Sequence, residues 1–188
     1  MSEAAVSAHT PPVVLTPDPQ TMRHTMGIFA TGVTIVTGAD DAGPTGFACQ
    51  SFASVSLAPP LVLFCADHRG RAWPRIREAG HFCVNVLGDD QADLCRRFGS
   101  AAGTKFDGLP WTASPWGTPL LPDVLCRVHA AVEAVHASGD HDVVIGRVSG
   151  LETPRRASPL VFYKGRFGIE DDSAHALPDL FGWNDVWS

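Results

Sequence analysis

Short runs of β-branched and apolar residues, each bounded by turn-forming residues, constrain the fold of this chain more than any other feature. Residues 31–38 read TGVTIVTG, residues 82–87 read FCVNVL, and residues 61–65 form an uninterrupted apolar run after two prolines. Val, Ile, Thr and Phe favour strands, whereas Gly, Pro and Asp favour the turns between them. Residues 127–136 and 141–150 flank the turn sequence ASGD and have the pattern of a β-hairpin. The chain is therefore predicted to be mainly β.

Three short helices are predicted between these strands. The first has Asp18 or Thr21 as its candidate N-cap and stops by Gly32, the second covers residues 71–80, and the third covers residues 89–99 with Asp89 as its cap. Strands predominate, and closing a sheet on itself removes its exposed edges. An antiparallel β-barrel with a few peripheral helices is therefore the most economical architecture.

Length and charge narrow the class of protein further. A chain of 188 residues with 45% hydrophobic residues is long enough for one core, and its 15 prolines and 18 glycines argue against a helical bundle. The formal net charge of -6 argues against a nucleic-acid partner, because phosphate backbones require a concentrated excess of Lys and Arg. We predict one domain over residues 18–170 and a mobile tail over residues 1–17. In the predicted C-terminal extension, residues 171–188, we expect the large aromatic side chains to pack on a partner subunit, namely Phe181, Trp183 and Trp187.

Cysteine usage and the start of the chain bear on location. The five cysteines are odd in number, widely spaced and never arranged as C-x-x-C, so reduced core cysteines are expected in place of disulfides or a zinc site. The first residues show no basic segment followed by an apolar one, as a signal peptide would. No apolar run approaches the roughly 20 residues that a membrane helix needs. A cytoplasmic protein without membrane contact is predicted.

Sequence motifs for several kinds of chemistry are absent. His129, His136 and His141 cluster in the sequence, but the first two lie seven apart on a predicted strand, where alternation places them on opposite faces. That spacing does not build a metal site, and we predict no metal. There is no G-x-S-x-G around a serine, and neither of the glycine-rich nucleotide motifs occurs.

A polar segment beside a core strand is the clearest candidate for function. Residues 46–65 read GFACQSFASVSLAPPLVLFC, and their first half is rich in small polar residues. Ala48, Cys49 and Ser51 would let the backbone approach a flat ligand closely, and Gln50 offers both a donor and an acceptor to an imide-like edge. The alternative is a polar edge strand, which composition alone favours.

Two other places carry candidate binding groups. His141 follows the turn of the predicted hairpin and is expected at the barrel rim, where it either serves a ligand or is simply satisfied by its neighbour Asp140. Lys164 and Arg166 could bind a phosphate, although two cations beside a strand are more often a solvated face.

The order of these segments resembles the short-chain flavin reductase family. ATGVTIVTG, GFACQSFASVSLAPPLVLFC, FCVNVL, RFG followed by KFDG, SGDH and FYKGRFG occur here in that family's order, over about residues 20–170. The resemblance implies the FMN-binding split barrel, an antiparallel fold of Greek-key type. Within the family, GFACQSFA, the loop GSAAGTKFDGLPW and a Trp-containing C-terminal extension are most similar to one branch. That branch is the reductase component of the two-component hydroxylase acting on the phenolic secosteroid of actinobacterial sterol breakdown.

The resemblance also implies where ligands bind. Residues 48–51 and Ser54 would contact the flavin ring and ribityl chain, residues 67–73 would lie near its phosphate, and His141 would lie near the nicotinamide of NADH. The segment with Arg166 would close the site. The residues so assigned to the flavin are Phe47, Ala48, Cys49, Gln50, Ser51, Ser54, Cys65, Ala66, Asp67, Arg69, Arg71, Trp73, Asn85, Lys105, Phe106, Arg166 and Phe167.

The activity implied by the resemblance is NADH-dependent reduction of FMN or FAD. The reduced flavin would then leave for a separate monooxygenase that hydroxylates an aromatic or phenolic substrate, and the reductase would be a homodimer with the flavin near the interface. Two alternatives stay open at this point. One is an oxidase that keeps FMN tightly bound, and the other is a flavin-binding protein without turnover.

Overall fold

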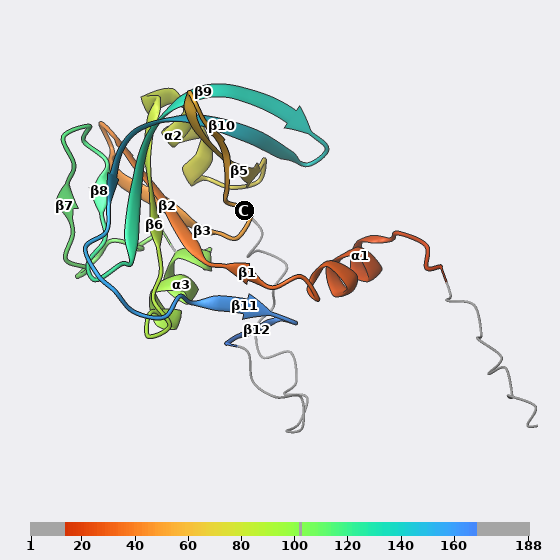
Figure 1. Cartoon of the computed structure of the whole chain (residues 1–188). Helices are drawn as coiled ribbons and strands as arrows, with labels where there is room; N and C mark the ends of the chain where they lie inside the picture. The colour runs from red at the N-terminus through yellow and green to blue at the C-terminus, as the bar shows by residue number, and fades with distance from the viewer. Residues whose placement is uncertain (1–13, 102, 169–188) are drawn as a thin grey trace, which may run out of the picture.

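The centre of the molecule is a seven-stranded antiparallel sheet (Figure 1). The computed structural model describes residues 14–101 and 103–168. Along the sheet the strands follow the order β3-β2-β6-β9-β10-β5-β4. Their bounds are β2 Thr34–Asp40, β3 Gly43–Cys49, β4 Ala53–Leu57, β5 Pro60–Asp67, β6 His81–Val86, β9 Cys126–Ser138 and β10 His141–Glu152.

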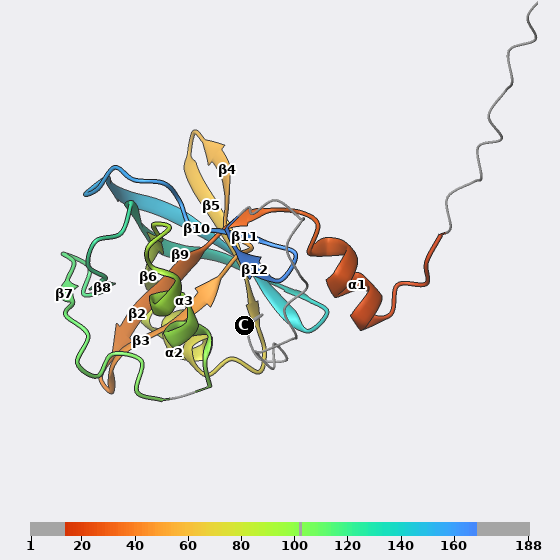
Figure 2. The ribbon, with the colours of Figure 1, turned by 90° about the horizontal axis from the view of Figure 1, so that it is seen from below.

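The sheet curls until β3 approaches β5 (Figures 1 and 2). Phe47 lies on β3, the first strand in the order, and Phe64 lies on β5, the last strand but one, yet their ring centroids lie 5.9 Å apart. Ser51 follows β3, and its Oγ accepts a hydrogen bond from the backbone N–H of Cys65 on β5 at 2.8 Å. No strand ladder joins β3 to β5 in the part of the chain that the structure describes. The predicted fold class, an antiparallel split barrel with few helices, is confirmed.

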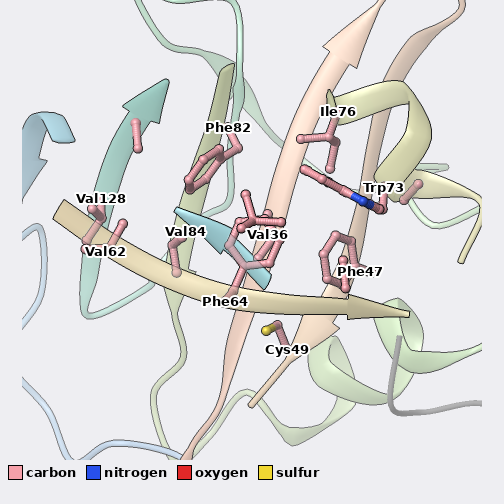
Figure 3. Packing of buried hydrophobic residues seen from close by; sticks show 14 residues of the cluster. Val36, Phe47, Cys49, Val62, Phe64, Trp73, Ile76, Phe82, Val84 and Val128 are labelled. Atoms are coloured by element: carbon pink, nitrogen blue, oxygen red, sulfur yellow. The ribbon is translucent and has the colours of Figure 1, made fainter. Parts of the chain in front are cut away.

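The core fills this curled sheet. Phe64 is fully buried and makes edge-to-face contacts with Phe82, Trp73 and Phe47, at centroid distances of 5.1, 5.6 and 5.9 Å (Figure 3). A second buried cluster, which includes Ile35 and Phe98, lies on the other side of β2 and β3. Aromatic side chains that interlock in this way contribute free energy beyond their burial, so the barrel holds its neighbouring loops on a rigid base.

The long β9–β10 hairpin is confirmed, and its two strands cross the molecule as one ribbon (Figure 1). Gly139 occupies the turn with φ 68°, a left-handed conformation that glycine adopts without steric cost. Register shifts interrupt the ladder between Ile145 and Gly146 and again between Val148 and Gly150. These irregularities bend the hairpin over the core.

Gly146 gives a stability prediction. A Cβ atom there would lie 2.3 Å from Cζ of Phe82, so Gly146→Ala would push a fully buried ring out of place. We expect the free energy of unfolding to fall by about 1–3 kcal/mol, as for other overpacked cores, and urea denaturation would measure the change. Gly32→Ala is the matched control, because no atom lies within 4 Å of its added Cβ. An equal effect of both substitutions would contradict the packing described.

The helices are short and peripheral. α1 spans Pro19–Met26, and the carboxylate of Asp18 caps it by accepting hydrogen bonds from the N–H groups of Gln20 and Thr21. Asp18 is therefore confirmed as the N-cap, but the predicted end at Gly32 is wrong. The chain leaves the helix through a turn after Met26 and begins a strand at Thr31.

The other two helices show one success and one error. α2 spans Ala72–Ala79 and ends at Gly80 with φ 76°, as predicted. α3 spans Ala92–Gly99, and the predicted cap Asp89 is wrong. The backbone N–H of Asp89 donates to Ser158 O at 3.0 Å, which draws this residue into a contact with a distant segment and out of the helix start.

The remaining short strands form two small sheets, and the polar segment of residues 46–65 divides between two environments. β1 (Thr31–Gly32), β11 (Val161–Tyr163) and β12 (Arg166–Phe167) make one small sheet, and β7 (Thr112–Ala113) pairs with β8 (Pro119–Leu120) in the other. Residues 46–49 belong to β3 and are buried, whereas β4 is a largely exposed edge strand. β3 is the other edge strand of the sheet, but its residues 46–49 are buried, so the interpretation as a solvent-facing polar strand fits Ser54 and does not fit Ala48.

Three further expectations concern membranes, metals and termini. Across residues 14–101 and 103–168, no helix is long and apolar enough to span a bilayer, and no group of three or more His, Cys, Asp or Glu side chains could hold a metal ion. Most of the predicted N-terminal tail, and the whole extension with Phe181, Trp183 and Trp187, lie outside the described residues.

Candidate functional site

A cavity of about 500 Å³ opens beside β3, between the N-terminus of α2 and the C-terminus of α3. This volume lies within the range of small-molecule sites. Three chain segments form its walls, and each belongs to an element anchored in a core cluster. The lining residues are Pro44, Thr45, Gly46, Phe47, Ala48, Asp67, Arg69, Gly70, Arg71, Ala72, Trp73, Arg75, Phe98, Gly99, Ser100, Ala101, Gly103, Lys105 and Phe106.

Two cations of this cavity have no carboxylate partner among the described residues. Lys105 Nζ donates to Phe98 O at 2.7 Å and to Gly46 O at 3.3 Å, and the guanidinium of Arg71 donates to Ala101 O. Burial, and then the positive charge of Arg71, lower the pKa of Lys105 to about 8. A bound anion would stabilise the charged form of Lys105 and so offset both effects, and this end of the cavity therefore suits a phosphate.

The other two arginines of the cavity are already neutralised. Arg69 makes a two-pronged contact with the carboxylate of Asp67, with Nη2 to Oδ2 at 2.6 Å, and these hydrogen bonds hold the pKa of Asp67 below its ordinary value. Arg75 is paired in the same way with Asp40 at the outer end of β2. The net positive potential therefore concentrates at Arg71 and Lys105.

The opposite side of the cavity is apolar and aromatic. Phe47 and Trp73 reach it from the core, and Phe106 packs edge-to-face on Phe98 with centroids 5.1 Å apart. The N-terminus of α2 also faces the cavity, and its first N–H groups favour negative charge. An aromatic wall beside a cationic end fits a flat ligand that carries a phosphate.

The structure brings eight of the predicted flavin residues together at this cavity. They come from β3, from the β5–α2 connection and from the loop after α3, which are distant in sequence. The eight are Phe47, Ala48, Asp67, Arg69, Arg71, Trp73, Lys105 and Phe106.

The other predicted residues lie at the junction of β3 and β5 or farther away. Ser51 and Cys65 are joined by their hydrogen bond, Gln50 lies just before Ser51, and Ser54 is exposed on β4. Cys49 and Ala66 are buried in the barrel core. Burial raises the pKa of the Cys49 thiol, so that side chain is a core group in this structure.

Asn85 lies outside the cavity and is fully buried. Its amide nitrogen donates to Thr37 Oγ1 at 3.0 Å and Ile35 O at 3.2 Å, while its amide oxygen accepts from the N–H of Leu121 at 3.1 Å. These bonds fasten the end of the long loop of residues 100–121 to the sheet. Asn85 therefore does not line the cavity; it holds the end of the loop that carries Lys105.

The two residues of the closing segment lie on the small sheet. Phe167 packs on Phe162 with centroids 5.6 Å apart, and the guanidinium carbon of Arg96 lies 5.2 Å from the centre of the Phe167 ring. Arg166 is exposed on the same strand, β12. Neither residue lines the cavity.

His141 sits at the tip of the hairpin, as predicted. Its Nδ1 lies 2.7 Å from Asp140 Oδ1, and in the β10–β5 ladder it stands opposite the cavity residue Asp67. The pairing with Asp140 agrees with the interpretation as a satisfied turn histidine. The position next to Asp67 also puts the imidazole close to the cavity.

Sequence reasoning missed some lining residues and a buried histidine. Gly46 and the end of α3 form part of the wall, and a Cβ on Gly46 would meet Val36 O at 2.8 Å and Phe98 at 3.0 Å. His129 is buried, with Nε2 2.9 Å from Glu152 Oε1 and its ring against Trp116. The strand pattern of residues 127–136 gave no sign that His129 is buried, because the side chain that covers it, Trp116, belongs to another segment of the chain.

Known proteins match this chain over most of its length. The model of the family described as flavin reductase like domain matches residues 26–170. The chain is 49% identical over 169 residues to "Flavin-dependent monooxygenase, reductase subunit HsaB" of Rhodococcus jostii, covering 89% of this chain and 85% of that protein. It is 40% identical over 149 residues to "FMN reductase (NADH) SmoA" of Agrobacterium fabrum, covering 79% of this chain and 84% of that one.

Two solved structures are similar in fold as well as sequence. Nitrilotriacetate monooxygenase component B from Mycobacterium thermoresistibile superposes with a TM-score of 0.77 at 43% identity, covering 86% of this chain and 94% of that one. The second is the NADH:FAD oxidoreductase SgcE6 of Streptomyces globisporus, in complex with NAD and FAD fragments. It superposes with a TM-score of 0.79 at 30% identity, covering 87% of this chain and 100% of that one.

Proposed function

This chain belongs to the flavin reductase-like domain family, and from that premise we propose that it is an NADH-dependent flavin reductase. It supplies reduced FMN or FAD to a separate flavin-dependent monooxygenase that acts on an aromatic or phenolic substrate. The relatives named as reductase subunits of monooxygenases support the proposal that a separate monooxygenase receives the reduced flavin. The observation that carries the proposal is the cavity itself, where an aromatic wall meets Arg71 and Lys105, two cations without a carboxylate partner among the described residues.

The residues present fit a flavin. Arg71, Lys105 and the N-terminus of α2 hold the phosphate, because they offer positive charge in a half-buried place. Phe47 and Trp73 pack against the apolar part, and the residues around Ser51 form the rim that the ring meets. A flavin held there would supply the hydride-accepting chemistry, with NADH as the donor. The protein's own contribution is to hold the two rings in contact, with His141 positioning the nicotinamide.

Consumption of NADH tests this proposal. With catalytic amounts of the purified protein, we expect the absorbance of NADH to fall only when FMN or FAD is added. A flavin-binding protein without turnover would give no flavin-dependent loss with NADH or NADPH. An oxidase with a resident flavin would instead be yellow as purified, and dialysis would not remove the colour.

The proposal includes a homodimer, and α1 supports it. None of the eight residues of this helix is buried, and both views of the chain show it standing to one side of the barrel (Figures 1 and 2). Met22, Met26 and Phe29 are 53%, 51% and 70% exposed. A helix this short is unstable alone in water, so it needs a surface to pack on. A second copy of the chain provides that surface.

Disruption of this apolar face should separate the subunits. We expect Met26→Glu combined with Phe29→Glu to sediment as a monomer in analytical ultracentrifugation, because two charges would enter an apolar contact. Leu151→Glu, which changes an exposed apolar residue on β10, is the matched control and should remain dimeric. A monomeric unaltered protein, or a dimer that survives the double substitution, would reject this interface.

Location and domain division complete the proposal. The protein acts in the cytoplasm, where NADH and a partner oxygenase are available. Residues 18–170 form the reductase domain, and residues 1–17 and 171–188 lie on either side of it in the sequence. The match of the family model to residues 26–170 supports this division.

A further inference from the structure

One buried carboxylate on the β9–β10 hairpin has no part in the flavin site as described above. Asp142 on β10 is 7% exposed, although it follows directly after His141 at the hairpin tip. Neighbouring residues of a strand point to opposite faces. The side chains of His141 and Asp142 therefore lie on opposite faces of the hairpin, and that of Asp142 faces α2.

The carboxylate of Asp142 gathers donors from two separate elements. Oδ2 accepts a hydrogen bond from Trp73 Nε1 at 2.8 Å and lies 3.5 Å from Arg77 Nη1, and both of these residues belong to α2. Oδ1 lies 3.0 Å from Nε2 of His68, in the connection between β5 and α2. The hydrogen bonds from Trp73 and then from His68 hold the pKa of Asp142 below its ordinary value.

These partners join the two halves of the proposed active site. Trp73 lines the cavity and packs on Phe64 in the core (Figure 3), so its bond to Asp142 fixes the cavity wall to the hairpin. His68 makes a second link, because its backbone N–H donates to Asp140 O at 3.0 Å. The segment that carries Asp67, Arg69 and Arg71 is thereby tied to the tip that carries His141.

A purely structural role does not require a charge at this position. A buried ion pair adds little net stability compared with well-packed apolar residues, and breaking it leaves an uncompensated charge. The carboxylate instead fixes the orientation of two side chains, because it accepts hydrogen bonds from the indole of Trp73 and the imidazole of His68.

We infer that Asp142 is a positioning residue of the reductase, which couples the flavin cavity to His141 through Trp73 and His68. This inference rests on the proposed function. Substitutions of His141 disturb only the nicotinamide side, whereas loss of the Asp142 carboxylate disturbs both sides. The signature of coupling is therefore a simultaneous change in the Michaelis constants for NADH and FMN.

The test is steady-state kinetics with NADH and FMN, below the unfolding temperature of every variant. We expect Asp142→Ala to raise both Michaelis constants, each by about tenfold, the effect of losing a hydrogen bond to a charged group. Asp142→Asn keeps an acceptor for Trp73 and should recover most of the loss. Glu133→Ala is the matched control, because it removes another ion-paired carboxylate of the same hairpin, remote from the cavity, and should leave both constants unchanged.

Each result decides the inference. Wild-type Michaelis constants in Asp142→Ala, with only a lower melting temperature, would show a structural role and overturn it. If Asp142→Ala does not fold, the exposed partner decides: His68→Ala should raise both constants by a smaller factor, and unchanged constants would overturn the inference. A wild-type protein without flavin-dependent NADH oxidation would reject the proposed function, and the inference would fall with it.

Discussion

Replacing Lys105 with Met is expected to raise the Michaelis constant for FMN by roughly 10- to 100-fold, the effect of losing one charged contact to a phosphate. The constant for NADH should stay close to its wild-type value, since Lys105 lies in the cavity lined by α3 and β3 and donates there to Phe98 O and Gly46 O. Steady-state titration of each substrate measures both constants. Lys164→Met is the matched control, because Lys164 is the other lysine of the chain and does not line the cavity.

The pH dependence of the same reaction gives an independent check on Lys105. Burial and the charge of Arg71 lower the pKa of Lys105 to about 8. The side chain is therefore charged below pH 8 and loses its charge as the pH rises through that value. We expect kcat/KM for FMN to fall above about pH 8, since this ratio reports the pKa values of the free enzyme. Lys105→Arg keeps its charge and should shift the fall to higher pH. The assignment of Lys105 to the phosphate would be contradicted if Lys164→Met raised the Michaelis constant for FMN and Lys105→Met did not. Such a result would indicate that the phosphate binds at the turn between β11 and β12, where Lys164 lies.

Replacing His141 with Ala is expected to raise the Michaelis constant for NADH by about tenfold or more, with little change in the constant for FMN. The imidazole stands at the hairpin tip opposite Asp67, and we propose that it positions the nicotinamide without transferring a proton. His141→Gln should retain part of the function, because an amide keeps a donor and an acceptor. Equal effects of His141→Ala on both substrates would reject the assigned role.

The strands were predictable from local sequence because β-branched residues and turns alternate so regularly. The hairpin about Gly139 and the end of α2 at Gly80 follow from glycine's freedom to adopt positive φ, which is a property of the residue itself. The cap at Asp89 failed for the opposite reason. Its backbone N–H donates a hydrogen bond to Ser158 O, almost seventy positions away in the chain, and no local sequence pattern predicts such a contact.

The candidate site shows the same division between local and distant information. Composition favoured a polar edge strand for residues 46–65. Both β3 and β4 are edge strands of the sheet, but only β4 is largely exposed, whereas residues 46–49 of β3 are buried beside the cavity. The resemblance pointed to eight residues that the fold does bring together. It could not show that the amide of Asn85 is occupied by the sheet and by Leu121, because hydrogen-bond partners in a core are set by the packing of distant segments.

Ser51 illustrates what the structure adds to a motif. Its hydroxyl accepts a hydrogen bond from the Cys65 N–H and lies 3.3 Å from the sulfur of Cys49, so it joins the end of β3 to β5. The same residue stands on the rim assigned to the flavin ring. A polar side chain at this junction holds the barrel edges together and leaves the rim rigid for a ligand.

The central claim is that flavin is a substrate which leaves the protein after reduction. Anaerobic mixing of a catalytic amount of protein with a large molar excess of NADH and FMN tests it most directly, with the visible absorbance of oxidised FMN as the readout. If the flavin leaves after each turnover, the whole FMN pool is bleached. Bleaching that stops at an amount of flavin equal to the amount of protein would show that the flavin stays bound, and would contradict the claim.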